Sequence, residues 1–162
     1  MEKKKNFYEF CDIVEKLRAP DGCPWDREQT HDSIRTNLLE EVHEALEALD
    51  TGDFEGFKEE LGEILLQVIF HAQIDAEQGG FDFDDVADGI CRKLLVRHPH
   101  VFGDLSADDA SEALRNWDAM KRATKGTKKQ ADIVKNVPRS LPALMRAEKV
   151  QGRARRVGFD WP

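Results

Sequence analysis

The sequence contains few cysteines, few aromatic residues and no long apolar run. Its three cysteines, Cys11, Cys23 and Cys91, form no Cys-x-x-Cys pair, so neither a disulfide framework nor a zinc knuckle is expected. No apolar segment approaches the roughly 18 residues that a membrane-spanning helix needs, and the N-terminus lacks the apolar stretch of a secretory signal. We therefore expect reduced thiols, no membrane partner and a cytoplasmic location.

Positive charge is also scarce in one half of the chain. The net charge is -8, and aromatic residues make up only 8% of the sequence. A generic nucleic-acid binder needs a positive field, so we expect no nucleic-acid partner. Residues 1–90 contain 8 Lys and Arg against 24 Asp and Glu, whereas residues 91–162 contain 16 against 8. An acidic half is thus followed by a basic half.

What the chain does have is helical periodicity, since apolar residues recur every three or four positions and no convincing strand is found. The length of 162 residues predicts one domain over residues 1–162, with a core at about 7–123 and then a mobile loop and a C-terminal helix. We expect an all-α helix bundle. The expected helices cover residues 7–19, 30–50, 54–78, 82–98, 106–120 and 141–156, with a turn-rich loop at 21–26 and a mobile loop at 124–135.

The ends of these helices carry recognisable signals. Gly52 suits the C-terminus of the second helix, and Asp53 suits the N-cap of the third. Asp82 is expected to cap the fourth helix, and Ser106 with Asp109 resembles a capping box for the fifth. The third helix has apolar residues around most of its circumference, which predicts a central, buried position.

Two short acidic runs carry the candidate chemistry. Glu41 and Glu44 are three residues apart on one helix, and Glu60 and Glu63 are three apart on the next, so each pair shares a face. The short break at 51–53 allows the two helices to fold back on each other. Four ionised carboxylates at such range would repel one another unless a cation neutralised them.

Mg²⁺ fits this arrangement best, because it accepts carboxylate oxygens and shares its shell with substrate phosphates. A solvated acidic helix face remains the alternative interpretation of the spacing, although the apolar character of the helix that carries Glu60 and Glu63 favours the metal site. A di-iron centre is another metal interpretation of such a bundle. It needs a Glu-x-x-His motif from each of two helices, and Glu40-x-x-His43 supplies one of them.

Basic and aromatic residues in the second half could bind phosphate and base. Lys93 and Arg97 are four residues apart on one expected helix, as are Trp117 and Lys121 on another. Cations opposite a metal would screen the oxygens of a triphosphate, and an indole could stack on a base. Each pair taken alone is better explained as a solvated helix edge, with Trp117 as an ordinary core residue. Trp25 is expected in a packed loop or lining a pocket.

His98 and His100 flank Pro99 at the end of an expected helix. A metal role can be imagined for them. The favoured interpretation is turn geometry and complementarity to the helix C-terminus.

Several ordered motifs together resemble the MazG nucleoside triphosphate pyrophosphohydrolases. They are Cys23-Pro24-Trp25-Asp26-Arg27-Glu28-Gln29-Thr30-His31, the Glu-Glu-x-x-Glu of Glu40, Glu41 and Glu44, the Glu-x-x-acid of Glu60 and Glu63, Arg97-His98-Pro99-His100-Val101-Phe102-Gly103, and Asn116-Trp117-x-x-x-Lys121. The resemblance runs from about Phe7 to the C-terminus. It implies an all-α bundle completed by homodimerisation.

The resemblance also implies a reaction and its residues. Nucleoside triphosphates, standard or modified, would be converted to monophosphate and pyrophosphate with Mg²⁺, for which Mn²⁺ could substitute, as housecleaning of the nucleotide pool. Glu41, Glu44, Glu60 and Glu63 would bind the metal, and Glu40, Glu41 and Glu44 would be catalytic, with Glu40 orienting or deprotonating the attacking water. Lys93, Arg97, Trp117 and Lys121 would contact the nucleotide, and Trp25 is a further substrate-binding candidate.

Two departures from the family pattern qualify this expectation. The family usually has Asp where Glu63 stands, and the extra methylene could change metal affinity or metal count. Longer members contain two copies of the domain, and this chain stops at residues 158–162, where a second copy would begin. An amino-terminal half that binds nucleotide and dimerises with little catalysis is therefore an alternative function. A plain acidic helical interaction module is another.

Overall fold

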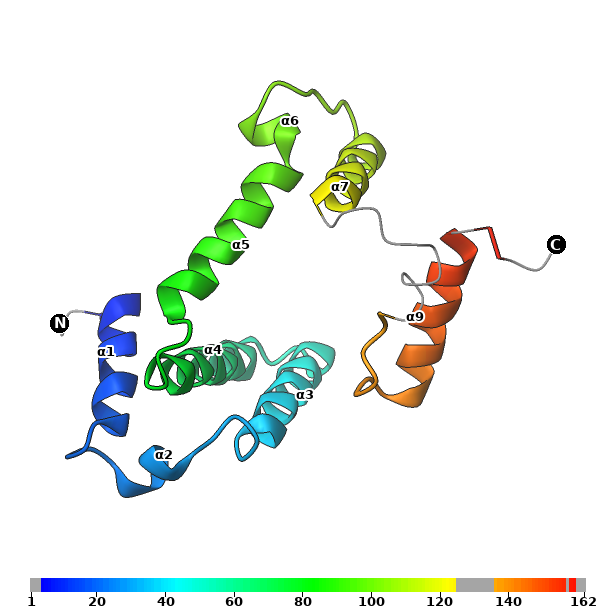
Figure 1. Ribbon diagram of the computed structural model, residues 1–162. Coiled ribbons are helices and arrows are strands. Elements are labelled where there is room, and N and C mark those ends of the chain that lie inside the picture. The colour runs from blue at the N-terminus through cyan, green and yellow to red at the C-terminus, as the bar shows by residue number, and fades with distance from the viewer. Residues whose placement is uncertain (1–3, 125–135, 157, 160–162) are drawn as a thin grey trace. The chain divides into compact units, whose positions relative to one another are not determined.

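The computed structural model describes residues 4–124, 136–156 and 158–159, and these residues form helices and loops without a β-strand (Figure 1). The predicted all-α class is confirmed. The chain divides into two compact units, Met1–Cys91 and Arg92–Pro162, and each is described by itself. The prediction of a single domain over residues 1–162 stays a prediction.

The N-terminal unit is built around a helical hairpin. Its elements are α1 (Phe7–Arg18), α2 (Pro24–Glu28), α3 (Arg35–Thr51), α4 (Phe54–Ala76) and the first part of α5 (Phe83–Arg97). α3 and α4 lie side by side, and α1 packs against α4 and α2 (Figure 1). Gly52 allows the hairpin to turn, because it ends α3 in the left-handed conformation with φ of 75°.

Side chains cap the starts of these helices as the sequence suggests. Asp53 begins α4 by accepting a hydrogen bond from the backbone N–H of Gly56 at 3.0 Å. At α5, the backbone N–H of Asp85 donates to Asp82 at 2.9 Å, and the N–H of Asp82 donates back to Asp85 at 3.2 Å. The predicted roles of Gly52, Asp53 and Asp82 are confirmed.

The core of this unit lies against the second half of α4. Its buried members are Val14, Ile34, Ile69, Phe70 and Ile74, from α1, the residue before α3, and α4. The first half of α4 is much more open, since Leu61 is 48% exposed. The predicted burial of this helix is therefore right for its C-terminal half only, which leaves the half with Glu60 and Glu63 near solvent.

The loop expected at 21–26 and the segment after the helix expected at 82–98 each contain a short helix. Pro24 starts the five-residue α2, and Pro99 starts the four-residue α6 (Pro99–Phe102). Proline suits the first position of a helix, because its fixed φ is helical and its missing N–H would have no partner there. The helix expected from residue 30 begins only at Arg35, because Thr30 and Ser33 form a side-chain-bonded turn.

The C-terminal unit contains the end of α5, α6, α7 (Ala110–Thr124) and α9 (Ala143–Arg156). α7 begins four residues later than expected. Asp109, not Ser106, caps it, since Asp109 accepts the backbone N–H of Glu112 at 2.7 Å. Most of the loop expected at 124–135 lies outside the described residues, and the expected C-terminal helix is confirmed as α9.

The expectations about thiols and membranes can be compared directly with the structure. Cys11, Cys23 and Cys91 are all unpaired, as predicted. Within the described part of the chain, no helix combines the length and the apolar character that crossing a bilayer requires.

Candidate metal and nucleotide sites

The α3–α4 hairpin brings three of the four predicted metal-binding carboxylates together. One oxygen from each of Glu41, Glu44 and Glu60 lies within 4.8 Å of the others. We call these three residues the carboxylate cluster. Glu41 and Glu44 lie one turn apart on α3, and Glu60 faces them from α4, so the cluster depends on the register of the hairpin.

The cluster concentrates negative charge at a partly shielded position. Glu41 and Glu60 are half-buried, whereas Glu44 is exposed. Burial raises the pKa of Glu41, and the neighbouring charges of Glu44, Glu63 and Glu60 raise it further. A hydrogen bond with Glu60 acts in the same direction. The ionised form of Glu41 is therefore disfavoured as long as no cation balances it.

The remaining predicted acidic residues lie at the edge of the cluster or outside it. Glu63 is exposed and close enough to raise the pKa of Glu41, but it is not one of the three residues whose oxygens converge. Glu40 is exposed and also lies outside that group. Neighbouring helical residues point in directions about 100° apart, so Glu40 cannot share the direction of Glu41.

The donor set of the cluster suits a hard divalent cation. It offers carboxylate oxygens only, which Mg²⁺ and Mn²⁺ prefer, and no imidazole or thiolate is in the group. A cation would remove the repulsion that raises the pKa of Glu41. The residues present therefore fit the ion that the sequence predicts.

The predicted nucleotide-contacting residues gather in the C-terminal unit. The Nζ of Lys121 lies 4.3 Å from the centroid of the Trp117 ring, and the guanidinium carbon of Arg97 lies 5.6 Å from it. Both distances are within the range of cation–π contacts. Trp117 is thus half-buried and lies near two cations, so the interpretation of Trp117 as an ordinary core residue is incomplete.

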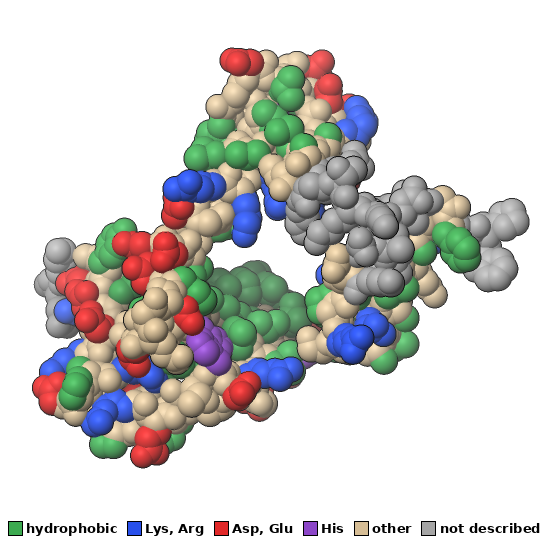
Figure 2. Space-filling model, in the orientation of Figure 1, with side chains coloured by type: hydrophobic (Ala, Val, Ile, Leu, Met, Phe, Trp, Pro, Cys, Tyr) green, Lys and Arg blue, Asp and Glu red, His purple; other side chains and the backbone are tan. Residues whose placement is uncertain are grey.

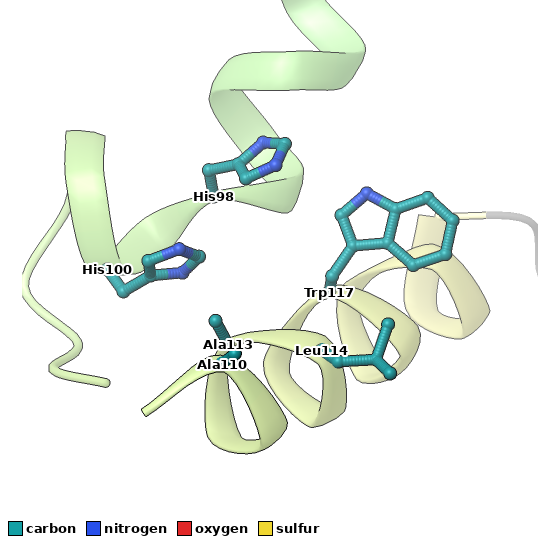
Figure 3. Close-up of a pocket in the computed structure, with 6 residues that line it drawn as sticks. All are labelled: His98, His100, Ala110, Ala113, Leu114 and Trp117. Atoms are coloured by element: carbon teal, nitrogen blue, oxygen red, sulfur yellow. The ribbon is translucent and has the colours of Figure 1, made fainter. Parts of the chain in front are cut away.

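Two pockets adjoin these residues. Lys93 and Arg97 line a cavity of about 310 Å³ together with Arg92, Val96 and Thr124. A cavity of about 410 Å³ is lined by His98, His100, Ala110, Ala113, Leu114 and Trp117 (Figure 3). The two histidines face α7 across it.

The histidines at the end of α5 agree with the favoured interpretation. A ring nitrogen of His98, Nδ1, lies 2.8 Å from the carbonyl oxygen of Leu94 and donates a hydrogen bond to it. This bond satisfies one of the last carbonyls of α5, so the role of His98 at the helix C-terminus is confirmed. The Nδ1 of His100 is buried and has no hydrogen-bond partner.

Two parts of the predicted site remain, namely Trp25 and the relation between the acidic and the basic residues. Trp25 on α2 is 61% exposed, so it is not packed as expected, and its role in substrate binding stays a prediction. The carboxylate cluster belongs to the N-terminal unit, while Lys93, Arg97 and Trp117 belong to the C-terminal unit. The predicted opposition of acidic and basic residues across one site therefore stays a prediction.

Sequence reasoning missed two tertiary links in the N-terminal unit. Arg18, only 9% exposed, donates from Nε and Nη2 to the two carboxylate oxygens of Glu77, at 2.8 and 2.7 Å. Its Nη1 donates to the carbonyls of Asp26 and Gln29 at 2.5 and 3.2 Å. Hydrogen bonding by Arg18 is the main cause that lowers the pKa of Glu77. The second link joins His31 to His71, which lies 40 residues further along the chain.

Comparison with known proteins finds relatives over nearly the whole chain. The MazG nucleotide pyrophosphohydrolase domain matches residues 29–102. A protein of Escherichia coli K12 called nucleoside triphosphate pyrophosphohydrolase is 49% identical over 92% of this chain and 57% of its own length. The nucleoside triphosphate pyrophosphohydrolase/pyrophosphatase MazG of Thermotoga maritima is 46% identical over 96% of this chain and 59% of its own. The chain thus spans a little over half the length of these relatives.

A solved structure supports the fold. The crystal structure of a MazG-related protein from Thermotoga maritima superposes with a TM-score of 0.61, covering 71% of this chain and 98% of that one. The sequence identity between them is 23%, so this likeness concerns the architecture alone.

Proposed function

Because this chain belongs to the MazG family, we propose that it is a metal-dependent nucleoside triphosphate pyrophosphohydrolase. The reaction takes a nucleoside triphosphate and water to the monophosphate and pyrophosphate. The observation that carries this proposal is the carboxylate cluster, in which Glu41, Glu44 and Glu60 converge from two helices. The names of the relatives from Escherichia coli and Thermotoga maritima support the same activity.

In this proposal the cluster and Glu63 hold Mg²⁺, with Mn²⁺ as a substitute. A bound ion of this kind supplies charge neutralisation for phosphate oxygens and lowers the pKa of a water molecule. Glu40, one residue before the cluster, helps to orient that water or accepts its proton. The water oxygen attacks the α-phosphorus, and the bond from that phosphorus to the oxygen bridging to the β-phosphorus breaks, so that pyrophosphate leaves.

Basic residues of the C-terminal unit bind the triphosphate. Lys93 and Arg97 offer cations from one side of a cavity, and Lys121 with Trp117 offers a cation and a flat ring. Charge that develops on the leaving pyrophosphate would be stabilised by these groups. Trp25 is a further candidate contact.

Dimerisation is also part of the proposal. α3 exposes Leu39, Val42, Leu46 and Leu49, at 55, 38, 50 and 43%, and their spacing places them on one stripe. Each of these four side chains is more than a third exposed among the described residues, so the stripe is open to a further partner. A second copy of the chain is the partner that the MazG resemblance implies, and it would complete the bundle.

Apolar side chains are also exposed in the C-terminal unit. Figure 2 shows hydrophobic side chains on the surface over α6 and α7, where Phe102 and Leu114 are both 61% exposed. They are further candidates for burial against a second copy.

Sedimentation analysis of the purified chain and of a Leu46→Glu variant tests the dimer, because a charge in the α3 stripe should produce monomers.

Housecleaning of the nucleotide pool in the cytoplasm is the cellular role we propose, because the MazG resemblance implies it. A second candidate function is favoured by the coverage of those relatives, since the chain spans only 57% of the Escherichia coli protein. The chain would then be a nucleotide-binding and dimerising half with weak catalysis. It would bind a triphosphate with Mg²⁺ without releasing pyrophosphate.

One experiment separates these functions. The purified chain is incubated with Mg²⁺ and a panel of standard and modified triphosphates, and monophosphate and pyrophosphate are measured. Glu44→Gln should lower turnover by ~10²-fold or more, the scale of losing one preorganised electrostatic group. Glu59→Gln is the matched control, because Glu59 is exposed on α4 and lies outside the cluster. Equal turnover in the two variants would defeat the assignment.

A further inference from the structure

Two histidines from distant parts of the chain meet head to head in the N-terminal unit. The Nδ1 atoms of His31 and His71 are 2.9 Å apart, and the two ring planes are inclined by only 7°. The ring centroids are 5.2 Å apart, which equals the 2.9 Å contact plus the radii of the two imidazole rings. Both nitrogens must therefore lie on the line between the centroids, so the rings lie edge to edge in one plane.

This geometry determines whether a hydrogen or a metal ion lies between the two Nδ1 atoms. The lone pair or the hydrogen of an imidazole nitrogen lies in the ring plane, so each Nδ1 points directly at the other. One nitrogen must carry the hydrogen and the other must accept it, because two lone pairs or two N–H groups would repel. A shared metal ion would need bonds of about 2.0–2.1 Å to each nitrogen, and the head-on 2.9 Å contact leaves no room for it.

The pair joins two segments that lie 40 residues apart in the chain. His31 lies in the turn that follows α2 and leads into α3, and His71 lies on α4. Asp75, one turn further along α4, has an oxygen 3.8 Å from Nε2 of His31. The other oxygen of Asp75 accepts the backbone N–H of Phe81 at 2.7 Å, just before α5.

The charged groups around the pair come from several elements. On α4, Asp75 is the carboxylate that faces His31, and Glu77 is already held by Arg18 of α1. Asp32 and Arg35 flank His31 along the chain and are exposed. Burial lowers the pKa of His71, and the nearby charge of His31 lowers it further.

We propose that His31 and His71 share one proton in an acid-sensitive latch, which fastens the turn preceding α3 onto α4 and opens when both rings are protonated. The doubly protonated pair has an N–H on each Nδ1 and two positive charges, so the contact becomes repulsive. Since α3 carries Glu41 and Glu44, the open latch loosens the helix that supplies two members of the carboxylate cluster. The latch does not depend on the proposed hydrolase activity.

The sign of the pH dependence follows from the direction of the shift. A histidine whose pKa is lower in the folded chain than its ordinary value of 6.5 stabilises the fold fully above that value. As the pH falls below 6.5, the unfolded chain takes up the proton more readily than the folded one, and stability is lost. The latch therefore weakens the fold on the acid side of neutrality.

Nitrogen NMR of the histidine rings tests the shared proton directly. At about pH 7.5, above the ordinary imidazole pKa, the spectrum of the purified chain without metal or nucleotide should show one of the two Nδ1 atoms protonated and the other not. It should also show scalar coupling between the two nitrogens across the hydrogen bond. Two protonated or two unprotonated Nδ1 atoms would overturn the proposal. This measurement needs no variant and stands even where a substitution prevents folding.

Thermal unfolding between roughly pH 7.5 and 5.5, on either side of the ordinary imidazole pKa, tests the acid sensitivity. His71→Asn keeps an amide that can bond to His31 but cannot titrate, so more than half of the wild-type fall in Tm over this range should disappear. His43→Asn is the matched control, because His43 is exposed on α3, and it should follow the wild type. An unchanged pH dependence in His71→Asn would overturn the latch.

Discussion

Removing the Arg18 side chain should weaken the contacts that hold α1 and α2 against α4 and so destabilise the fold. Arg18 reaches all three elements at once, through both oxygens of Glu77 and through the carbonyls of Asp26 and Gln29. Its guanidinium carbon also lies 5.2 Å from the centroid of the Phe70 ring. Arg18→Ala therefore leaves a carboxylate and two carbonyls without these hydrogen-bond donors, and it removes a cation–π contact from the core.

The magnitude follows from the burial of the two partners. Breaking a buried ion pair by removing one partner costs about 3–5 kcal/mol. The side chain of Glu77 is 35% exposed, so its stranded carboxylate regains part of its hydration. We therefore expect a loss of about 2–3 kcal/mol in the free energy of unfolding, near the lower limit for buried pairs. This corresponds to a fall in Tm of about 5–10 °C for a chain of this size.

The assay is urea unfolding followed by circular dichroism, with a double-mutant cycle of Arg18→Ala and Glu77→Ala. The matched control is the cycle on Lys16 and Asp21, an ion pair at the same end of α1 whose side chains are 67% and 74% exposed. That pair should show almost no coupling. If the coupling of Arg18 with Glu77 were no larger than that of the control pair, the reasoning would be refuted.

Two further predictions use glycine and acid pH. Gly52→Ala should destabilise the hairpin by about 1 kcal/mol, because φ at this position is 75°. Gly89→Ala in α5 should stabilise the fold by about 0.5–1 kcal/mol, because nothing lies within 4 Å of the added Cβ. Chemical denaturation of the two variants measures both changes. The lowered pKa of Glu77 means that the bond to Arg18 stabilises the fold above the ordinary value of 4.5 and is lost as the pH falls through the lower, folded value. In Glu77→Gln this part of the acid dependence should vanish, and an unfolding curve identical to the wild type at each acid pH would speak against it.

Local signals in the sequence were enough to place the carboxylates. The three-residue spacing of Glu41 and Glu44 and the break at Gly52 determine a face and a turn, and these two features bring Glu60 opposite them. Glu63 could not be placed as well, because one turn of helix moves a side chain from the centre of an interface to its edge. That difference depends on how the two helices cross, which no local spacing encodes.

The pairs that hold the N-terminal unit together had no such signal. Arg18 and Glu77 are 59 residues apart, and His31 and His71 are 40 apart, so each contact exists only once α1 and α3 have packed on α4. The short helices α2 and α6 were predictable in part, since a proline at the first helical position marks both. At α2 the flanking turn residues favoured a loop instead.

The sequence predicts a helix at residues 30–50, but it does not identify what covers the apolar face of α3. Val42 and Leu46 lie about one turn apart on this face and are 38% and 50% exposed. Periodicity reports that a face is apolar and not what covers it. A stripe that meets a second copy and a stripe that meets the core of its own chain look alike in the sequence.

Direct binding of Mn²⁺, followed by the loss of the free-ion electron paramagnetic resonance signal, tests the carboxylate cluster most directly. The wild-type chain should bind Mn²⁺, and Mg²⁺ should displace it. Glu60→Gln should weaken Mn²⁺ binding by more than about 10-fold, since mutating even the residues that support metal ligands lowers metal affinity by this much. Glu59→Gln should bind Mn²⁺ like the wild type. Equal Mn²⁺ affinity in all three proteins would contradict the assignment of the cluster as a metal site.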